Sequence, residues 1–508
     1  MQLGKIYTAQ SDFASPHIIE IEVDISSKGI PGCTIVGLAD KAIEESRERI
    51  AAALKNSGLA KIKQKKIIVS LSPAHLKKEG PLFDLPIAIG MLLADDENEI
   101  SFEANNKLFV GELALDGSVK PIAGALSIAH AAKESGFTEL YLPKVNADEA
   151  SIIDGVTIYG VSTILELVLH LQQEKAETPN GEHLIEKTVY SPRDFKNGYA
   201  VDFSHVIEQS SVKRALEIAA AGGHNVALYG PPGTGKTMLA QAFCSILPDL
   251  SADEQIETTM IHSCMGVLTN PLIQTPPLRA PHHTASYVSV IGGGASPKPG
   301  EVTLAHNGVL FLDEFPEFDK RVLESLREPL EEKKIRISRS KASVTFPANF
   351  ILLAAMNPPS EVYRSGSLIT PADERRFRRK LSGPIMDRID LWIEVPKIEH
   401  TKLLSKGSSS EASSAVKLRV IAARRVQHGR LGPGALNSVI PSQKISTLVI
   451  DPEAKVILDD ASKKLDISPR VYHKLIKISQ TIADLESSPS ITSHHILEAL
   501  QYRPKEII

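Results

Sequence analysis

One eight-residue segment supplies the residue types that bind the phosphates of a nucleotide. It reads Gly230, Pro231, Pro232, Gly233, Thr234, Gly235, Lys236 and Thr237, a complete GxxxxGKT pattern. Glycines let backbone N–H groups approach phosphate, Lys236 reaches the outer phosphates, and the Thr237 hydroxyl ligates magnesium. An apolar run at 226–229 precedes the segment and a helical pattern at 238–247 follows it, which distinguishes the motif from a glycine-rich turn. The segment therefore predicts a site for ATP and Mg²⁺.

Two carboxylates follow a second apolar run. Residues 309–312 are all apolar, as in a central parallel strand, and Asp313 and Glu314 come directly after them. Ligands of α/β sheets bind at the carboxyl ends of the strands. We therefore expect Asp313 to hold magnesium and Glu314 to orient and polarise the attacking water. The alternative is an acidic helix cap ahead of Pro316.

Three further polar residues fit the same chemistry. Asn357 ends the apolar run at 350–356, where an amide could bridge the lytic water and the outer phosphate, although asparagine is also a common turn former. Arg388 and Arg470 could each supply positive charge to the transition state of phosphoryl transfer. Taken alone, each arginine is better explained as a surface ion pair.

The composition excludes several classes of protein. The chain has 508 residues, 42% of them hydrophobic and 23% charged, which is ordinary for a soluble protein with a few domains. No run of residues is long and apolar enough for a membrane span, and the first ten residues do not form a secretory signal, so we expect a cytoplasmic protein. Three scattered cysteines predict neither disulfides nor a zinc site. The net charge of -4 means that any DNA site must be local.

Polar segments divide the chain into an α/β protein of three units. Residues 172–194 read as a linker, and the Gly/Ser-rich stretch at 405–414 reads as a second break. We expect an α+β domain at 1–171, an ATP-binding α/β core at 195–400 and a helical domain at 415–508. The best helix of the last unit starts after Ser468, a good N-cap, with Pro469 in its first turn.

A basic hairpin is the strongest candidate for contact with nucleic acid. Residues 333–341 alternate apolar and polar positions ahead of an extended run at 344–346. The basic side chains expected on its face and tip are Lys334, Arg336, Arg339 and Lys341. Backbone phosphates of DNA bind such groups without regard to sequence. A solvated edge hairpin is the alternative. The basic cluster at 375–380 fits contact with DNA or with a neighbouring subunit, and fits a plain solvated helix face at least as well.

Several longer segments resemble a known family. GPPGTGKT, VLFLDEF, AAMNP and LSGPIMDRID resemble the AAA+ ATPases of the magnesium-chelatase-like branch. PLRAPHHTAS, GGGASPKPGEVTLAHNGVLFLDEFPEF and SPRVYHKLIKISQTIADL narrow the resemblance to the bacterial ComM (YifB) family. LSPAHLKKEGPLFDLPIAIGMLL and GELALDGSVKPIAGAL are similar to the opening domain of that family, which has a Lon-protease-like fold.

The resemblance implies an ATP-driven hexameric DNA helicase that promotes branch migration in the recombination that accompanies natural transformation. It implies a sensor-1 role for Asn357, a sensor-2 role for Arg470 in a C-terminal helical lid, and for Arg388 the role of a finger that reaches the nucleotide of the neighbouring subunit. A hairpin ahead of sensor 1 lines the central pore of related motors. Single-stranded and branched DNA, further copies of the chain and recombination proteins are the implied partners.

At two places the sequence departs from the patterns of related families, and the functional residues of those families cannot be assigned to this chain there. Lon-type proteases carry a Ser and a Lys in two turns that here read Glu79-Gly80-Pro81-Leu82 and Ala123-Gly124-Ala125-Leu126. Leucine at both positions leaves neither nucleophile nor base, so we expect no peptidase. The chain also lacks the cysteine-containing segment that many relatives carry after Asn357. The adjacent His282 and His283 have no further ligand at metal-site spacing, which favours a structural or pore-loop role.

Three alternative functions remain open at this stage. A chelatase motor that inserts magnesium into a porphyrin would resemble the last two units but not residues 1–171. An ATP-dependent protease would need the absent Ser and Lys. A scaffold that binds ATP without hydrolysis would have no use for Glu314 and Arg388.

Overall fold

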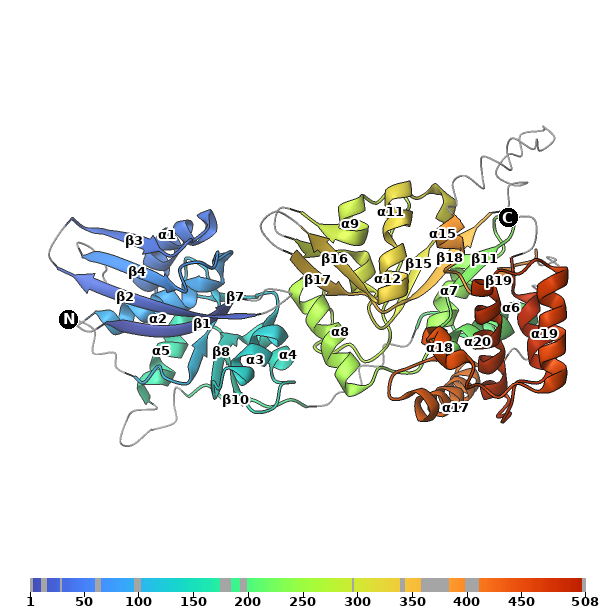
Figure 1. Ribbon diagram of the computed structural model, residues 1–508. Helices are drawn as coiled ribbons and strands as arrows, with labels where there is room; N and C mark the ends of the chain where they lie inside the picture. The colour runs from blue at the N-terminus through green and yellow to red at the C-terminus, as the bar shows by residue number, and fades with distance from the viewer. Residues whose placement is uncertain are drawn as a thin grey trace. The chain divides into compact units, whose positions relative to one another are not determined.

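The computed structural model describes residues 3–10, 16–27, 30–59, 65–95, 102–173, 184–191, 199–294, 297–338, 343–357, 383–397 and 411–504. The chain forms two compact units (Figure 1). Unit 1 comprises residues 1–195 and 256–273, and unit 2 comprises residues 196–255 and 274–508.

Unit 1 is built on a mixed sheet whose eight described strands lie in the order β10-β9-β8-β5-β1-β2-β4-β3. Strand β2 is antiparallel to both β1 and β4, whereas β1, β5, β8 and β9 run parallel to one another and β10 is antiparallel to β9. The strands are β1 (Gly4–Gln10), β2 (His17–Ser26), β3 (Gly32–Val36), β4 (Lys66–Ser72), β5 (Lys107–Phe109), β8 (Glu139–Pro143), β9 (Thr157–Val161) and β10 (Lys187–Thr188), and β6 (Glu112–Leu113) pairs with β7 (Val119–Lys120) outside the sheet.

Helices pack against this sheet, and their apolar side chains form two buried clusters with those of the strands. Helix α2 is buried along nearly its whole length, and α1 packs beside it with its first turn capped by the carboxylate of Asp40. An uncapped first turn would leave backbone N–H groups without a partner, so Asp40 sets where α1 begins. The helices are α1 (Lys41–Asn56), η1 (Pro81–Phe83), α2 (Asp84–Ala94), α3 (Ala125–Glu134), α4 (Lys144–Ala150) and α5 (Ile164–Gln173).

A segment from the middle of the sequence folds with unit 1. Helix α8 (Ala252–Cys264) runs into residues 256–273, which belong to this unit. Ile256 and Met260 pack against one of its apolar clusters. The Ser263 hydroxyl donates to the buried carboxylate of Glu149, and the Ser263 carbonyl accepts from Gly124 N at 3.0 Å. The chain therefore leaves unit 2 after the phosphate-loop helix and returns to it before the next strand.

Unit 2 contains a parallel sheet with described strands in the order β12-β15-β18-β11-β19. Strands β11 and β15 are buried at every position, as their all-apolar sequences predict for the centre of a sheet covered on both faces. The strands are β11 (Val226–Tyr229), β12 (Leu278–Arg279), β15 (Val309–Leu312), β18 (Ile351–Met356) and β19 (Leu391–Glu394).

Two short hairpins extend unit 2 beyond the sheet. Strand β16 (Lys334–Ser338) pairs antiparallel with β17 (Ser343–Pro347), which confirms the predicted hairpin, and β13 (Gly292–Gly293) pairs with β14 (Lys298–Pro299). The helices that lie among these strands are η2 (Phe203–His205), α6 (Ser210–Gly222), α7 (Lys236–Ser245), α9 (Tyr287–Ile291), α10 (Glu301–Leu304), η3 (Phe315–Glu317), α11 (Lys320–Ser325), α12 (Arg327–Glu332) and α15 (Gly383–Met386).

The C-terminal part of unit 2 is helical, as the sequence predicts (Figure 1). Helix α20 begins after Ser468, whose hydroxyl accepts from Val471 N, and it buries Leu475, Ile478 and Ile482 in one stripe. The helices are α17 (Ser413–Leu431), η4 (Asn437–Val439), α18 (Ser442–Ile445), α19 (Pro452–Lys464), α20 (Pro469–Leu485) and α21 (Ser493–Gln501). The described residues contain no helix with the length and apolar character of a membrane span.

Candidate functional site

The phosphate loop connects β11 to α7. Gly233 and Gly235 adopt φ of +77° and +84°, left-handed conformations that side chains with a Cβ rarely adopt. The buried Lys236 ammonium donates to Gly230 O at 2.8 Å, to Pro231 O at 2.9 Å and to Asn357 Oδ1 at 2.9 Å. Burial lowers the pKa of the Lys236 ammonium and the charge of Asp313 opposes that shift. The loop thus has the open backbone and the cation that a polyphosphate requires.

The parallel register brings three strand ends together. Tyr229 is opposite Met356, and Leu312 is opposite Ala354, so the residues that follow β11, β15 and β18 meet at one edge of the sheet, which we call the carboxyl edge. There the Thr237 hydroxyl donates to Asp313 Oδ2 at 3.2 Å. A hydroxyl beside a carboxylate is a donor set that suits Mg²⁺. The residues predicted to bind ATP and Mg²⁺ therefore fit that complex.

Glu314 has an unusual backbone and an unexpected neighbour. Its φ is +51°, which costs energy in a residue other than glycine and is typical of functional sites. Nδ1 of His283 lies 3.0 Å from Glu314 Oε2, and the His282 ring packs over His283 with 4.2 Å between centroids. The sequence pattern favoured a structural or pore-loop role for His283; the structure places it against the carboxylate expected to polarise water. In the sequence, the adjacent pair His282 and His283 was the one feature that pointed to this contact.

Arg388 lies at the opposite edge of the sheet, which we call the amino edge. Asn225, the residue before β11, donates from Nδ2 to the Arg388 carbonyl at 3.0 Å, whereas the phosphate loop follows the other end of β11. A strand of four residues spans about 13 Å. Arg388 therefore lies away from the phosphate loop of its own chain.

Arg470 lies beside Arg388. Both guanidinium groups contact Glu331 Oε1, Arg388 at 2.5 Å and Arg470 at 2.9 Å. A cavity of about 330 Å³ opens here, and its charged lining includes the cations Lys333, Arg388, Arg470, Lys474 and Lys477 and the carboxylates Glu331, Asp387 and Asp390. Burial lowers the pKa of Lys333, Lys474 and Lys477. Such a concentration of cations suits an anion with several charges.

Of the four basic residues predicted on the hairpin, the structure describes two, Lys334 and Arg336. Arg336 is exposed and donates to Glu332 at 2.7 Å, and the Lys334 ammonium lies 3.7 Å from the same carboxylate. Ile335, between them, is buried, as the alternating pattern predicts. Arg339 and Lys341, and the basic cluster at 375–380, lie outside the described residues.

Leu82 and Leu126, the two leucines compared above with the Lon-type dyad, lie in apolar surroundings. Leu126 is fully buried in α3, and Leu82 packs against the same apolar cluster. Neither side chain can supply a nucleophile or a base.

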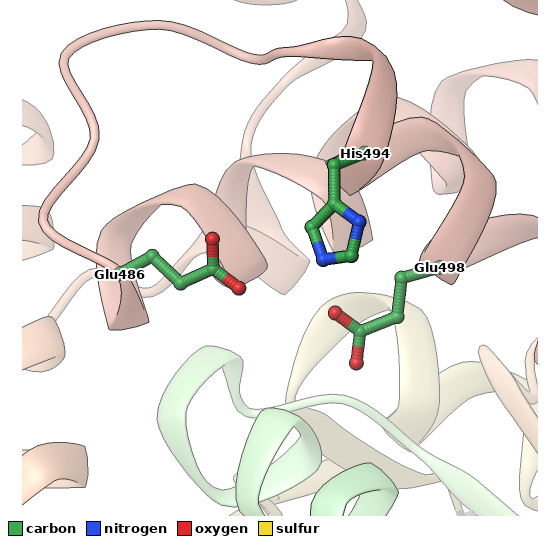
Figure 2. Close-up of side chains that lie close together, drawn as sticks. All are labelled: Glu486, His494 and Glu498. Carbon is green, nitrogen blue, oxygen red and sulfur yellow. The ribbon is translucent and has the colours of Figure 1, made fainter.

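A third polar cluster lies among the C-terminal helices. Ligand atoms of Glu486, His494 and Glu498 lie within 4.8 Å of one another (Figure 2). Arg214 from α6 already donates to Glu486 at 3.2 Å and to Glu498 at 3.0 Å, and the Tyr502 hydroxyl also donates to Glu498. With a guanidinium paired to both carboxylates, the cluster ties α20 and α21 to α6 as an ion-pair network.

Comparison with known proteins gives matches along most of the chain. The family model described as magnesium chelatase, subunit ChlI, matches residues 202–403; two related models match residues 21–146 (subunit ChlI of Mg-chelatase) and 410–503 (subunit ChlI C-terminal). The chain is 41% identical to the competence protein ComM of Haemophilus influenzae, over 99% of this chain and 98% of the relative.

Two further relatives differ in how much of the chain they cover. The protein YifB of Escherichia coli is also 41% identical, over 99% of this chain and 97% of the relative. The DNA replication licensing factor Mcm6 of Drosophila melanogaster is 26% identical over 63% of this chain and 37% of that protein. Similarity to ComM and YifB therefore extends over both units, whereas similarity to Mcm6 is partial.

Proposed function

Because the chain belongs to the ComM/YifB family of magnesium-chelatase-like AAA+ ATPases, we propose that it hydrolyses ATP to drive movement along DNA. The observation that carries the proposal is the placement of the candidate residues at two edges of one sheet. The phosphate loop, Asp313 and Asn357 meet at the carboxyl edge, while Arg388 and Arg470 meet at the amino edge.

Each residue of the carboxyl edge takes one part of the hydrolysis. Lys236 and the backbone N–H groups of its loop bind the phosphates, and Thr237 with Asp313 holds Mg²⁺, which when bound neutralises charge on the phosphates. Glu314 accepts a proton from the attacking water and so orients it. Asn357, already hydrogen-bonded to Lys236, is placed to contact the outer phosphate.

The amino edge completes the site of a neighbouring subunit. Arg388 and Arg470 are too far from their own phosphate loop to stabilise its transition state, so we infer that both act on the nucleotide of the next subunit. A head-to-tail contact of this kind closes into a ring, and six is the ring size that the family resemblance implies. A subunit without a neighbour then hydrolyses ATP poorly.

The β16–β17 hairpin is the proposed contact with DNA. Repeated around a ring, Lys334 and Arg336 concentrate positive charge that the net charge of the whole chain conceals. The partial similarity to a DNA replication licensing factor and the name of the competence protein both favour DNA as the polymer. We propose branch migration during the recombination of natural transformation as the process, with a Lon-like unit 1 that retains the fold without the peptidase.

An unwinding assay on branched DNA tests this proposal. Wild-type protein should convert a labelled four-way junction or fork into product only with ATP and Mg²⁺, and Lys236→Ala should not. ATP turnover by the wild type without any DNA product, at low salt and with either substrate, would contradict the helicase assignment. A porphyrin added in a separate arm should leave ATP turnover unchanged; stimulation there would instead favour a chelatase motor, the function that the names of the family models suggest.

A further inference from the structure

Glu331 holds the two amino-edge arginines together through a single oxygen atom. Arg388 Nη2 lies 2.5 Å and Arg470 Nη2 2.9 Å from Glu331 Oε1. The Arg388 side chain is only 8% exposed, and its second terminal nitrogen donates to the Pro384 carbonyl. In this arrangement the Arg388 guanidinium is held against Glu331 and the Pro384 carbonyl and is largely buried.

The electrostatics identify Glu331 as the group that makes this arrangement possible. Two guanidinium groups on one oxygen repel each other, and the carboxylate that contacts both of them compensates this repulsion most directly. Partial burial opposes ionisation of Glu331, but the hydrogen bonds and charges of Arg388 and Arg470 lower the pKa of its carboxyl. Nε of Arg388 is buried and has no hydrogen-bond partner among the described residues, so one donor of this guanidinium is unused in this arrangement. A phosphate with more than one negative charge would compete with Glu331 for both arginines.

Glu331 belongs to α12, the short helix that directly precedes the β16–β17 hairpin. Glu331 lies near the end of α12, and β16 begins after Lys333. Lys333 N donates to Pro329 O at 3.1 Å, and Lys333 O accepts from Ala348 N at 2.8 Å, so the base of both hairpin strands is fixed to the end of α12. Glu332, the next residue, pairs with Arg336 of the hairpin. A displacement of the hairpin is therefore expected to move Glu331, whose Oε1 contacts both arginines.

We propose that Glu331 is a latch that keeps Arg388 and Arg470 from the neighbouring nucleotide until DNA engages the β16–β17 hairpin. This inference rests on the proposed function and adds to it a positioning residue that couples DNA binding to hydrolysis. Glu331 touches neither nucleotide nor water in this scheme; it acts through the two arginines. In the absence of DNA the latch lowers the rate, and movement of the hairpin withdraws it.

The test compares Glu331→Gln with Glu328→Gln in the assembled full-length protein. Glu328 lies one turn earlier in α12, is partly exposed and forms no ion pair within the described part of the chain, so it is a matched control. ATP turnover is measured with and without a single-stranded oligonucleotide, and DNA affinity is measured separately by fluorescence anisotropy. Thermal unfolding and nucleotide binding check that both variants are folded.

We expect Glu331→Gln to raise the DNA-independent kcat about fivefold or more, the lower range of coupling between two sites, with KM for ATP unchanged. Stimulation by DNA should fall toward unity, while DNA affinity should stay at the wild-type value. Adding Arg388→Ala should abolish the gain, because the effect passes through that arginine. Glu328→Gln should behave as wild type in every measurement.

Two results would overturn the latch. One is a Glu331→Gln variant with wild-type turnover both without and with DNA. The other is a folded variant whose DNA-independent turnover falls, because Glu331 would then place the arginines for catalysis instead of restraining them. If the wild type is not stimulated by DNA but Glu331→Gln still raises turnover, the restraint on the arginines is supported and DNA as the polymer is not.

Discussion

The imidazole of His283 is within hydrogen-bonding distance of the Glu314 carboxylate, with 3.0 Å between Nδ1 and Oε2. With a proton on Nδ1, His283 donates to one carboxylate oxygen and leaves the other to accept from water. A base oriented by a third group is a recurrent arrangement in hydrolytic sites. Since Glu314 also has a left-handed backbone, the contact helps to fix a carboxylate whose position the chain alone does not favour.

Replacing His283 with Ala should therefore lower kcat for ATP hydrolysis while KM for ATP stays unchanged. We expect a loss of about tenfold, less than the hundredfold or more expected when the base itself is removed in Glu314→Gln. His283→Gln, which keeps a donor, should recover part of the loss. His282→Ala keeps the contact between His283 and Glu314, because His282 Nδ1 bonds to Thr284, and removes only the ring packed over His283, so it should lower kcat less than His283→Ala does. A rise in kcat in His283→Ala would mean that the imidazole restrains Glu314.

Mixed rings should show that Arg388 serves the neighbouring subunit. Arg388→Ala alone and Glu314→Gln alone should each lose most turnover, by about a thousandfold for the arginine. In a mixture, a Glu314→Gln subunit supplies its intact Arg388 to a neighbour with an intact Glu314. Random association of equal amounts restores roughly a quarter of the interfaces in a head-to-tail ring. The mixtures must first be shown to co-assemble. If their turnover then stays at the level of the separate variants, Arg388 does not act on the neighbouring subunit.

The salt dependence of DNA binding tests the hairpin. Lys334→Ala combined with Arg336→Ala should weaken binding of single-stranded DNA and reduce the slope of log K against log salt, by about 0.7 for each DNA phosphate that the variant no longer neutralises. Lys320→Ala with Arg321→Ala removes the same charge from exposed positions of α11 and is the control. Equal slopes for the two double variants would show that only overall charge matters, and the hairpin would then be an ordinary solvated edge.

The sequence was most informative where chemistry depends on adjacent residues. All-apolar runs predicted strands β11 and β15, and parallel pairing explains why Asn357 and Asp313 meet Lys236 and Thr237 at one edge. The carboxyl ends of parallel strands all lie at the same edge of the sheet. A polar residue that directly follows such a strand can therefore be assigned to that edge from the sequence alone.

Contacts between distant residues could not be predicted in this way. Neither Glu331 nor His283 belongs to a pattern that specifies its partner, since an exposed glutamate in a short helix has many possible ion pairs. The packing of α8 is a similar case: Ile256 and Met260 indicate that the helix buries one face, but not that the face packs in unit 1. These features follow from the arrangement of whole elements.

Asp390 should make unit 2 sensitive to acid. Its carboxylate accepts from Asn225 N at 3.0 Å, and His224 and Lys474 lie nearby. Burial opposes ionisation, but the His224 ring, with Nδ1 3.7 Å from the carboxylate, and the charge of Lys474 lower the pKa of Asp390 from 3.8 to about 2. A carboxyl with a lowered pKa in the folded state stabilises that state above its unfolded pKa, and this contribution is lost as pH falls from about 4 to about 2.

Asp390→Asn should accordingly destabilise unit 2 by about 2 kcal/mol at pH 7, and the difference from wild type should shrink as pH falls through that window. Trp392, the single tryptophan, is buried two residues away in β19, so its fluorescence during urea unfolding reports on this unit. Asp387→Asn, at an exposed position, should change stability by less than about 0.5 kcal/mol. If the Asp390→Asn difference were as large at pH 2.5 as at pH 7, the hydrogen-bonding shape of the side chain, and not its charge, would be the source of the stability.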